Sequence, residues 1–285
     1  MNRFILGTVQ FGLKYGINNI LGQPNRNTTI EIFNLAHQLG ISTLDSAESY
    51  GNAHQLIGDF HFLSDFEFKI NTKFKSIEKE NIYIRVKNTC ELLNIKKINV
   101  CFFHSFPDYL NKTLHQEFEK LIALDFVNQI GVSVYTNEEF NIVINDPIVK
   151  VIQCPFNLFD NFNQRGDLIL KAKEKGKKIQ IRSIFLQGLF FLDPNYLKGN
   201  LVELKDDILF LKKITSEFQI SISDLCLQYA LSFKEIDEII IGVDTPSQLI
   251  SNSIACLNTI PSELVDRINS IQIKNKSLLY PYNWK

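Results

Sequence analysis

The chain has 285 residues, of which 45% are hydrophobic and 21% are charged, and its formal net charge is −1. This composition is ordinary for a globular protein. Acidic and basic residues are intermingled, which excludes the basic stripe of a nucleic-acid-binding protein and the polybasic patch of a membrane-surface protein.

The five cysteines are scattered along the chain, and none of them form a CxxC pair. We therefore expect buried free thiols in a reducing compartment and no metal site. No apolar run reaches the roughly 18 residues of a membrane-spanning helix. The amino-terminal apolar run is short and lacks the small-residue cleavage site of a signal peptide. We expect a soluble, cytoplasmic protein.

Eight short apolar segments have the length and the residue types of β-strands. The segment 97–106 is almost continuously apolar, which is typical of parallel strands that are covered on both faces. We predict strands within 3–12, 41–45, 66–74, 97–106, 128–136, 149–160, 177–190 and 236–245.

Segments with helical periodicity alternate with these strands. The segment 27–40 begins with polar Asn27 and Thr28, carries apolar residues at helical spacing and stops at Gly40. We predict helices within 27–40, 53–60, 80–94, 111–125, 137–146, 164–176, 203–219, 221–233, 246–258 and 261–272. The aromatic tail 276–285 is expected to be irregular.

The alternation of eight strands with helices predicts an α/β protein with a closed (β/α)₈ barrel, the TIM-barrel fold. Length alone fits one or two domains. Because there is no linker, low-complexity tract or charge block, we expect a single domain over residues 1–285. The alternative is an open, doubly wound sheet. It would carry a G-x-G-x-x-G motif after the first strand, and the sequence GTVQFG does not match this motif.

In a barrel of this kind, active groups lie at the C-terminal ends of the strands. The predicted strand ends carry polar residues at intervals close to the roughly 30 residues of a βαβ unit. These residues are Asp45, Lys73, His104, Ser133, Gln153, Arg182 and Ser183. Tyr50 lies in the polar loop after Asp45. We expect all of them to converge on one rim.

Four of these residues form a chemically coherent set. A free phenol has a pKa of roughly 10 and gives up its proton poorly at neutral pH. The ammonium of Lys73 would stabilise the phenolate of Tyr50 and lower its pKa, and Asp45 would keep the lysine charged and in position. His104 would orient a bound carbonyl or assist proton transfer. The set predicts a phenol that protonates an oxygen while hydride reaches the attached carbon.

Each residue also has a simpler interpretation. Tyr50 could serve only in packing, and Asp45 could merely cap the next helix. His104, which lies among phenylalanines, could be a core histidine. Lys69 and Lys75 share the strand phase of Lys73, so only the strand-end position favours Lys73. The coincidence of four strand-end positions favours the catalytic interpretation.

The chain resembles the aldo-keto reductases from end to end. The similar segments cover all eight predicted strands in the family's order: LGTVQFG, LDSAESYGN, NTKF, FFHSF, IGVSVY, VIQCPFNLFD, IRSIFLQGLF and IIIGVDTPSQLISN. The RSxFLQG pattern resembles a bacterial branch of the family. The resemblance implies a (β/α)₈ fold and carbonyl reduction, or alcohol oxidation, with NADP or NAD. It implies Tyr50 as the acid, Lys73 and Asp45 as its tuning pair, and His104 as the substrate-orienting group.

The resemblance also implies a set of cofactor-binding residues. They are Gly7, Thr8, Asp45, Ser133, Gln153, Arg182, Ser183, Leu186, Gly188, Gly242, Asp244, Gln248 and Asn252. In this set, Ser133 and Gln153 match residues that hold the nicotinamide carboxamide. The segment 183–188 matches the pyrophosphate site, and Gln248 and Asn252 match the adenosine end.

Three positions depart from the family pattern. Val134 stands where asparagine is common, and Arg182 stands where many members place an aromatic ring on the nicotinamide, although arginine can also stack. Asp244 lies in a segment that often carries lysine or arginine. A carboxylate there would repel a 2′-phosphate and accept a hydrogen bond from a free ribose hydroxyl. Our hypothesis is a weakened preference for NADP and use of NAD, unless Lys274 or Lys276 compensates.

The expected partner is a small-molecule carbonyl or alcohol substrate, with no nucleic acid and no membrane, and we expect a monomer or weak homo-oligomer. Candidate substrate-lining aromatics are Phe11, Tyr15, Phe106, Phe156, Tyr280, Tyr282 and Trp284. Such a rim suits an aldehyde or a sugar ring. An alternative is a cofactor-binding sensor or regulatory barrel with little turnover. A barrel hydrolase or lyase would require paired strand-end carboxylates or a metal cluster, and the sequence shows neither.

Overall fold

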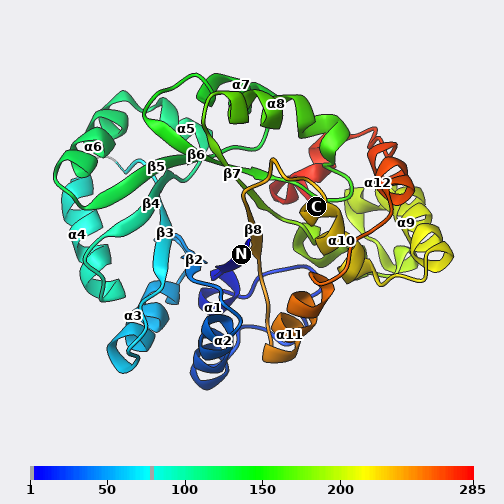
Figure 1. The fold of residues 1–285 in the computed structure, drawn as a ribbon, viewed down its shortest axis with the longest axis horizontal. Coiled ribbons are helices and arrows are strands. Elements are labelled where there is room, and N and C mark those ends of the chain that lie inside the picture. Colours follow the sequence, from blue (N-terminus) through cyan, green and yellow to red (C-terminus); the bar gives the residue numbers. More distant parts are fainter. Residues whose placement is uncertain (1–2, 78–79) are drawn as a thin grey trace.

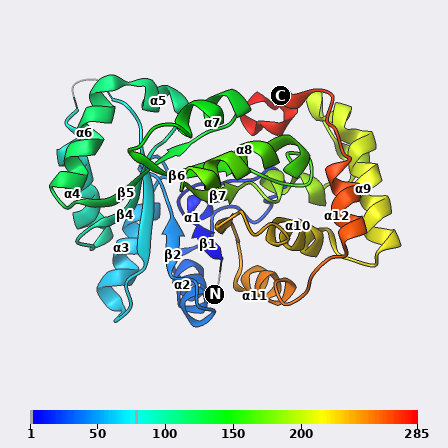
Figure 2. The same ribbon diagram turned by 45° about the horizontal axis from the view of Figure 1, so that its top comes forward.

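The computed structural model describes residues 3–77 and 80–285, so residues 1, 2, 78 and 79 of the expected domain lie outside the description. Strands β1 to β8 form a closed barrel in which every neighbouring pair is parallel and follows chain order. Figures 1 and 2 show the strands at the centre and the helices around them. The predicted (β/α)₈ barrel is confirmed.

The strands are short and the helices cover their outer side. The strands are β1 (Phe4–Gly7), β2 (Thr43–Asp45), β3 (Lys69–Phe74), β4 (Ile98–Phe103), β5 (Val127–Ser133), β6 (Val149–Pro155), β7 (Lys178–Arg182) and β8 (Glu238–Ile241). The helices are α1 (Val9–Gly12), α2 (Arg26–Gln38), α3 (Ala53–Leu63), α4 (Ile82–Leu93), α5 (Phe106–Leu110), α6 (Lys112–Ala123), α7 (Asn137–Val143), α8 (Phe162–Glu174), α9 (Lys205–Glu217), α10 (Ile222–Leu231), α11 (Pro246–Ala255) and α12 (Ser262–Asn269).

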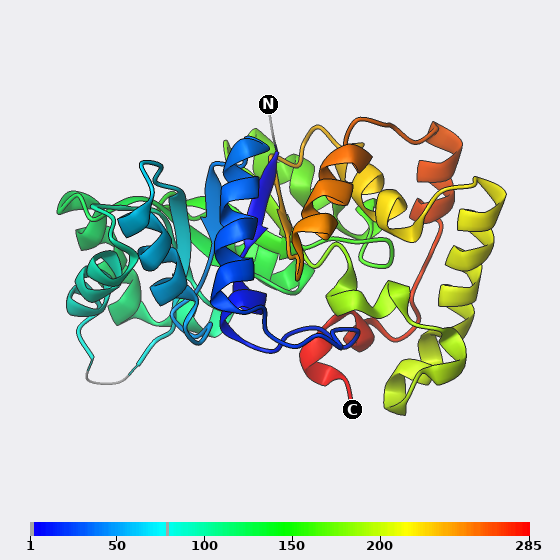
Figure 3. The ribbon, with the colours of Figure 1, turned by 90° about the horizontal axis from the view of Figure 1, so that it is seen from below.

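The strand register brings the polar strand ends to one level. Gly7 of β1 is paired with Asp45 of β2, and Ser133 of β5 is paired with Gln153 of β6. Because all strands run in the same direction, these residues share the C-terminal rim. In Figure 3, β1 runs downward from the amino terminus, so this rim lies at the bottom of the view.

A small apolar cluster fills the inside of the barrel below the rim. It consists of Val100, Phe102 and Val151, all of them buried. The ring of Phe102 lies over Gly131, where an added Cβ would come within 2.4 Å of a ring atom. The Nζ atom of Lys73 lies 5.9 Å from the centre of the same ring. The interior of the barrel beneath the polar rim is therefore filled by packed apolar side chains.

Several predicted boundaries are wrong by a few residues. The first predicted strand, 3–12, ends at Gly7 and is followed by the short helix α1, which buries Phe11. The second begins at Thr43, the sixth ends at Pro155, and the eighth ends at Ile241. An apolar run alone does not distinguish a strand from the buried helical turn that follows it. Helix α5 and the 3₁₀ turns between residues 186 and 204 were not predicted.

The tail 276–285 forms two 3₁₀ turns, Lys276–Leu279 and Pro281–Asn283. The indole N–H of Trp284 donates to the carbonyl of Leu278 at 2.8 Å. Four of the five cysteines are buried, Cys256 is half-buried, and all five are free. Within residues 3–77 and 80–285 there is no cluster of three His, Cys, Asp or Glu side chains that could hold a metal ion. No helix in these ranges is long and apolar enough to span a bilayer.

We expect acid to destabilise the protein through His54, which is 5% exposed and lies 2.9 Å from the hydroxyl of Thr72. Burial, followed by the charge of Lys73, lowers the pKa of His54 to about 4, whereas an unfolded histidine titrates near 6.5. Between these values the unfolded state binds a proton that the folded state does not. Stability therefore falls as the pH falls through this window, by about 2 kcal/mol between pH 7 and pH 5.

Urea unfolding at pH 7 and pH 5 measures this effect. His54→Gln should remove that part of the pH dependence, and the same change at His37, which is exposed on α2, serves as the control. A pH dependence in His54→Gln that equals that of the parent would contradict the assignment.

Candidate active site

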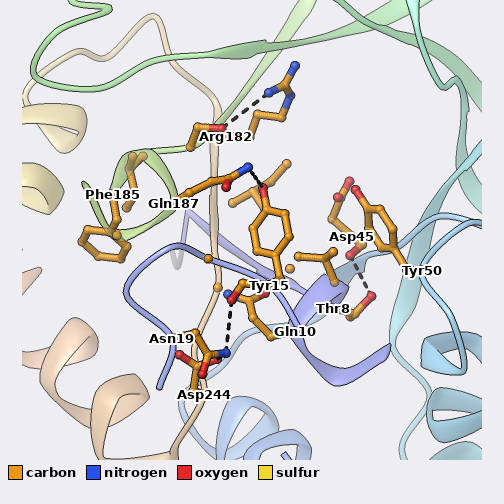
Figure 4. Close-up of a pocket in the computed structure, with 18 of the residues that line it drawn as sticks. Thr8, Gln10, Tyr15, Asn19, Asp45, Tyr50, Arg182, Phe185, Gln187 and Asp244 are labelled. Atoms are coloured by element: carbon orange, nitrogen blue, oxygen red, sulfur yellow. Dashed lines mark hydrogen bonds between the residues drawn. The ribbon is translucent and has the colours of Figure 1, made fainter. Parts of the chain in front are cut away.

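A cavity of about 540 Å³ lies at the C-terminal rim of the barrel. Its size falls within the roughly 300–1,000 Å³ of small-molecule and cofactor sites. Residues at the ends of the strands, or in the loops that follow them, line it from all eight strands, as Figure 4 shows in part. The four predicted catalytic residues, Asp45, Tyr50, Lys73 and His104, all lie in its wall.

An ion pair between Asp45 and Lys73 forms the base of the cavity wall. The Nζ atom of Lys73 donates to Oδ2 of Asp45 and, at 2.9 Å, to the carbonyl of Ser46. The amide of Gln153 donates to the other carboxylate oxygen at 2.9 Å. Lys73 is 2% exposed and Asp45 is 4% exposed. Burial lowers the pKa of Lys73, and the Asp45 carboxylate opposes this change.

Tyr50 lies beside this pair, in the loop after β2. The Nζ atom of Lys73 is 5.2 Å from the centre of the phenol ring. Burial, and then the charge of Asp45, raise the pKa of Tyr50, while the charge of Arg182 lowers it. The expectation that Lys73 lowers the pKa of Tyr50 is wrong for the protein as it stands. The main physical reason is burial of the phenol, and the second is that Asp45 compensates the lysine charge at contact distance and itself repels a phenolate.

Two glycines hold the loop that carries Tyr50. An added Cβ on Gly12 would lie 1.7 Å from the carbonyl oxygen of Tyr50, and one on Gly51 would lie 2.2 Å from that of Gly12. Gly51 also has a positive φ of 52°. The backbone of α1 therefore contacts the Tyr50 loop directly, and only glycine permits this approach.

His104 follows β4 and presents its ring to Tyr50 edge-on, at 6.3 Å between ring centres. Its Nδ1 atom is buried without a hydrogen-bond partner among the residues described. Burial, and then the charges of Lys73 and Lys75, lower the pKa of His104 to about 4. The imidazole is therefore neutral at pH 7 and can form hydrogen bonds without carrying charge.

Most of the predicted cofactor-binding residues line the same cavity. They are Gly7, Thr8, Asp45, Ser133, Gln153, Arg182, Ser183, Gly188, Gly242, Asp244, Gln248 and Asn252. Leu186 does not line it, and its proposed role toward the cofactor stays a prediction. Its side chain is fully buried in the hydrophobic core, at the start of the 3₁₀ turn Leu186–Phe191. Its neighbours Phe185 and Gln187 line the cavity in its place.

The segment 13–25, which we call the strap, crosses the rim after α1 and was not predicted to be part of the site, apart from Tyr15. The amide of Gln187 donates to the hydroxyl of Tyr15 at 3.1 Å. The amide of Asn19 donates to Oδ1 of Asp244 at 3.2 Å. Figure 4 shows the first contact and places Asn19 beside Asp244. The polar turn residues YGINN after the first predicted strand were the available signal for this segment.

The predicted aromatic rim is largely absent from the cavity. Of the seven candidates, Tyr15 lines it, whereas Phe11 and Phe156 are fully buried in the core. Tyr135, Phe185 and Phe191 line it and were missed. Aromatic residue type does not distinguish core from cavity, because both are apolar environments.

Arg182 and Asp244 lie at opposite ends of the close-up in Figure 4. The guanidinium of Arg182 is stacked over the ring of Tyr135 at 4.2 Å. The backbone N–H of Asp244 donates to Oε1 of Gln248 at 2.6 Å, and burial raises the pKa of the Asp244 carboxyl. Among the described residues, the cavity wall contains one lysine, Lys73, and one arginine, Arg182.

The family model described as "Aldo/keto reductase family" matches residues 3–273 of the chain. No curated protein sequence matches this chain. Among solved structures, the aldo-keto reductase AKR11C1 from Bacillus halodurans (holo form) is 16% identical, with a TM-score of 0.75 over 95% of this chain and 92% of that one. The glycerol dehydrogenase AKR11B4 from Gluconobacter oxydans is 17% identical, with a TM-score of 0.72 over 94% of this chain and 90% of that one.

At these identities the solved structures establish the fold, and the family model establishes the family. The match of that model to nearly the whole chain agrees with the observed barrel. The chain belongs to the aldo/keto reductase family and is an NAD(P)-dependent oxidoreductase of that family.

Proposed function

We propose that the enzyme reduces the carbonyl group of an aldehyde or ketone to an alcohol, or catalyses the reverse oxidation, with Tyr50 as the general acid or base. The main support is that Tyr50, the Asp45–Lys73 ion pair and His104 meet in the wall of one cavity. Each of these groups alone is compatible with many reactions. Together they supply a proton donor beside a cation and a neutral hydrogen-bonding imidazole.

The residues of the cavity suit a nicotinamide dinucleotide. The side-chain oxygens of Gln10 and Gln153 are buried beside the cavity without a hydrogen-bond partner in the described ranges. We assign the carboxamide end to Ser133 and Gln153 and the adenosine end to Asp244 and Asn252. When bound in its reduced form, the nicotinamide supplies the hydride that the carbonyl carbon accepts.

The protein residues then handle the proton. Tyr50 is protonated at neutral pH because burial raises its pKa, and this protonation state suits an acid in the direction of reduction. Its hydroxyl proton passes to the carbonyl oxygen, which becomes the alcohol oxygen, and a phenolate remains beside the ammonium of Lys73. His104 donates a hydrogen bond to the same oxygen and orients it. In alcohol oxidation the proton returns to Tyr50.

Replacement of Tyr50 by Phe should lower kcat for aldehyde reduction by about 10²–10⁴-fold, since the proton donor is lost while the ring remains. Cofactor affinity, measured by fluorescence titration, should stay within about twofold, because the family resemblance gives Tyr50 a role in the chemistry rather than in cofactor binding. Tyr83→Phe, on α4 and away from the cavity, is the matched control. Activity of Tyr50→Phe close to that of the parent would refute the assignment.

We further propose that NADH is preferred over NADPH. Asp244 places a carboxylate at the adenosine end, and its Oδ1 atom is already held by Asn19. Neither Lys274 nor Lys276 lines the cavity. Neither lysine that was considered as a compensating cation therefore lies in the cavity wall, and the charge of Lys274 acts on Asp207 of α9. A 2′-phosphate would meet a carboxylate without a cation, whereas a free ribose hydroxyl can donate to it.

Fluorescence titration should give a dissociation constant at least about tenfold lower for NADH than for NADPH. Asp244→Asn removes the charge and keeps the shape, so it should strengthen NADPH binding several-fold and change NADH binding less. Glu263→Gln, an exposed change of the same charge on α12, controls for net charge. Tighter binding of NADPH to the parent protein would overturn the proposed preference.

A further inference from the structure

We propose that Arg182 binds an oxyanion group of the substrate, a carboxylate or a phosphate, and that the enzyme acts on carbonyl compounds that carry such a group. This inference rests on the proposed carbonyl chemistry at Tyr50 and specifies its substrate class. It starts from a cation in the cavity wall that has no carboxylate partner among residues 3–77 and 80–285.

The hydrogen bonds of Arg182 leave most of its donors unused. One guanidinium nitrogen donates to the carbonyl of Val134 at 3.2 Å, and the other terminal nitrogen donates to the hydroxyl of Ser183 at 3.4 Å. A guanidinium has five N–H donors in a planar fork that matches a carboxylate or a phosphate. The half-buried side chain therefore retains donors that can reach a ligand in the cavity.

Arg165 provides an internal comparison, because it also contacts Tyr135, the residue whose ring lies under the guanidinium of Arg182. Its guanidinium makes two hydrogen bonds of 2.7 Å to the carboxylate of Asp160, and it also donates to the carbonyl of Tyr135. Arg165 is 2% exposed and its charge is fully compensated within the protein. The chain thus pairs the arginine that supports the structure and leaves Arg182, in the cavity wall, without a counter-ion.

The charges around Arg182 favour an anion at the catalytic end of the cavity. The charges of Asp45 and Lys73 cancel, and His104 is neutral because burial lowers its pKa to about 4. Arg182 therefore leaves this end with one net positive charge. Asp244, the remaining acidic residue of the described wall, lies at the opposite end with Asn19.

Arg182 is also held in place before any ligand binds. Its guanidinium is stacked on the ring of Tyr135, and the rings of Tyr280 and Tyr282 pack edge-on against that ring at 5.6 and 5.0 Å. A guanidinium that is fixed in this way loses little conformational entropy when it binds an anion. The charge of Arg182 also lowers the pKa of both Tyr50 and His104, which places it within electrostatic range of the reacting oxygen.

The test uses two matched pairs of aldehydes, 4-oxobutanoate with butanal and glyceraldehyde 3-phosphate with glyceraldehyde. The parent enzyme should have a kcat/KM at least about tenfold higher for the charged member of one pair than for its neutral member. A preference for 4-oxobutanoate indicates a carboxylate site, and a preference for glyceraldehyde 3-phosphate indicates a phosphate site. Arg182→Gln should lower kcat/KM for that charged aldehyde about 30–100-fold, mainly through KM, and for its neutral partner less than about threefold. Arg182→Lys should restore part of the loss.

Arg267→Gln, a change of the same charge on α12, controls for net charge and should leave both ratios unchanged. Equal losses on charged and neutral aldehydes, or weaker NADH binding that accounts for the whole loss, would overturn the proposal, because Arg182 would then serve the cofactor. An absence of any preference for a charged aldehyde in the parent enzyme would also overturn it.

Failure of the proposed carbonyl reduction would give a different result, namely no cofactor oxidation with any of the four aldehydes. In that case calorimetry with 4-hydroxybutanoate and glycerol 3-phosphate, which needs no turnover, still decides the anion site. Binding of one of them to the parent protein and its loss in Arg182→Gln supports the site. Equal binding to both proteins, or binding to neither, rejects it.

Discussion

The buried ion pair between Asp45 and Lys73 is the interaction on which the rest of the site depends. Removing two charges from water costs several kcal/mol for each ion, and good geometry with further hydrogen bonds must offset this cost. Gln153 supplies the second contact to the carboxylate, and the carbonyl of Ser46 supplies one to the ammonium. Since loss of one partner of such a pair typically costs about 3–5 kcal/mol, the site and the stability of the rim are linked.

The two members of the ion pair shift the pKa values of neighbouring side chains in opposite directions. The carboxylate of Asp45 adds to the burial that raises the pKa of Tyr50, and the ammonium of Lys73 adds to the burial that lowers the pKa of His104. Both side chains are thereby neutral at pH 7, the phenol with its proton and the imidazole without a second one. The contact between Gly12 and Gly51 fixes the phenol beside the ammonium, so the barrel core positions the proton donor through backbone packing.

The barrel and the strand-end residues could be predicted because both follow from a repeat of about 30 residues that places each strand end on one rim. Contacts within the rim could not be predicted in the same way. The position of Leu186 depends on a 3₁₀ turn in which its own φ is +45°, and the strap depends on contacts between Asn19 and Asp244, 225 residues apart. Periodicity carries no information about either. The sign of the Tyr50 pKa shift was also missed, because it depends first on burial of the phenol and then on the position of Asp45, and neither can be read from residue spacing.

The cavity has opposite charges at its two ends, and this arrangement bears on how two ligands would share it. At the adenosine end, Asn19 occupies Oδ1 of Asp244, so under the proposed cofactor preference a ribose hydroxyl would use the other carboxylate oxygen. At the catalytic end, Arg182 is the cation left without a counter-ion. A dinucleotide without a 2′-phosphate would place its ribose hydroxyls beside the carboxylate of Asp244. An anionic carbonyl compound would place its negative charge beside the guanidinium of Arg182. Exchange of the two ligands would bring the anionic compound to the carboxylate and is therefore disfavoured. The same two residues would therefore orient the cofactor and select the substrate.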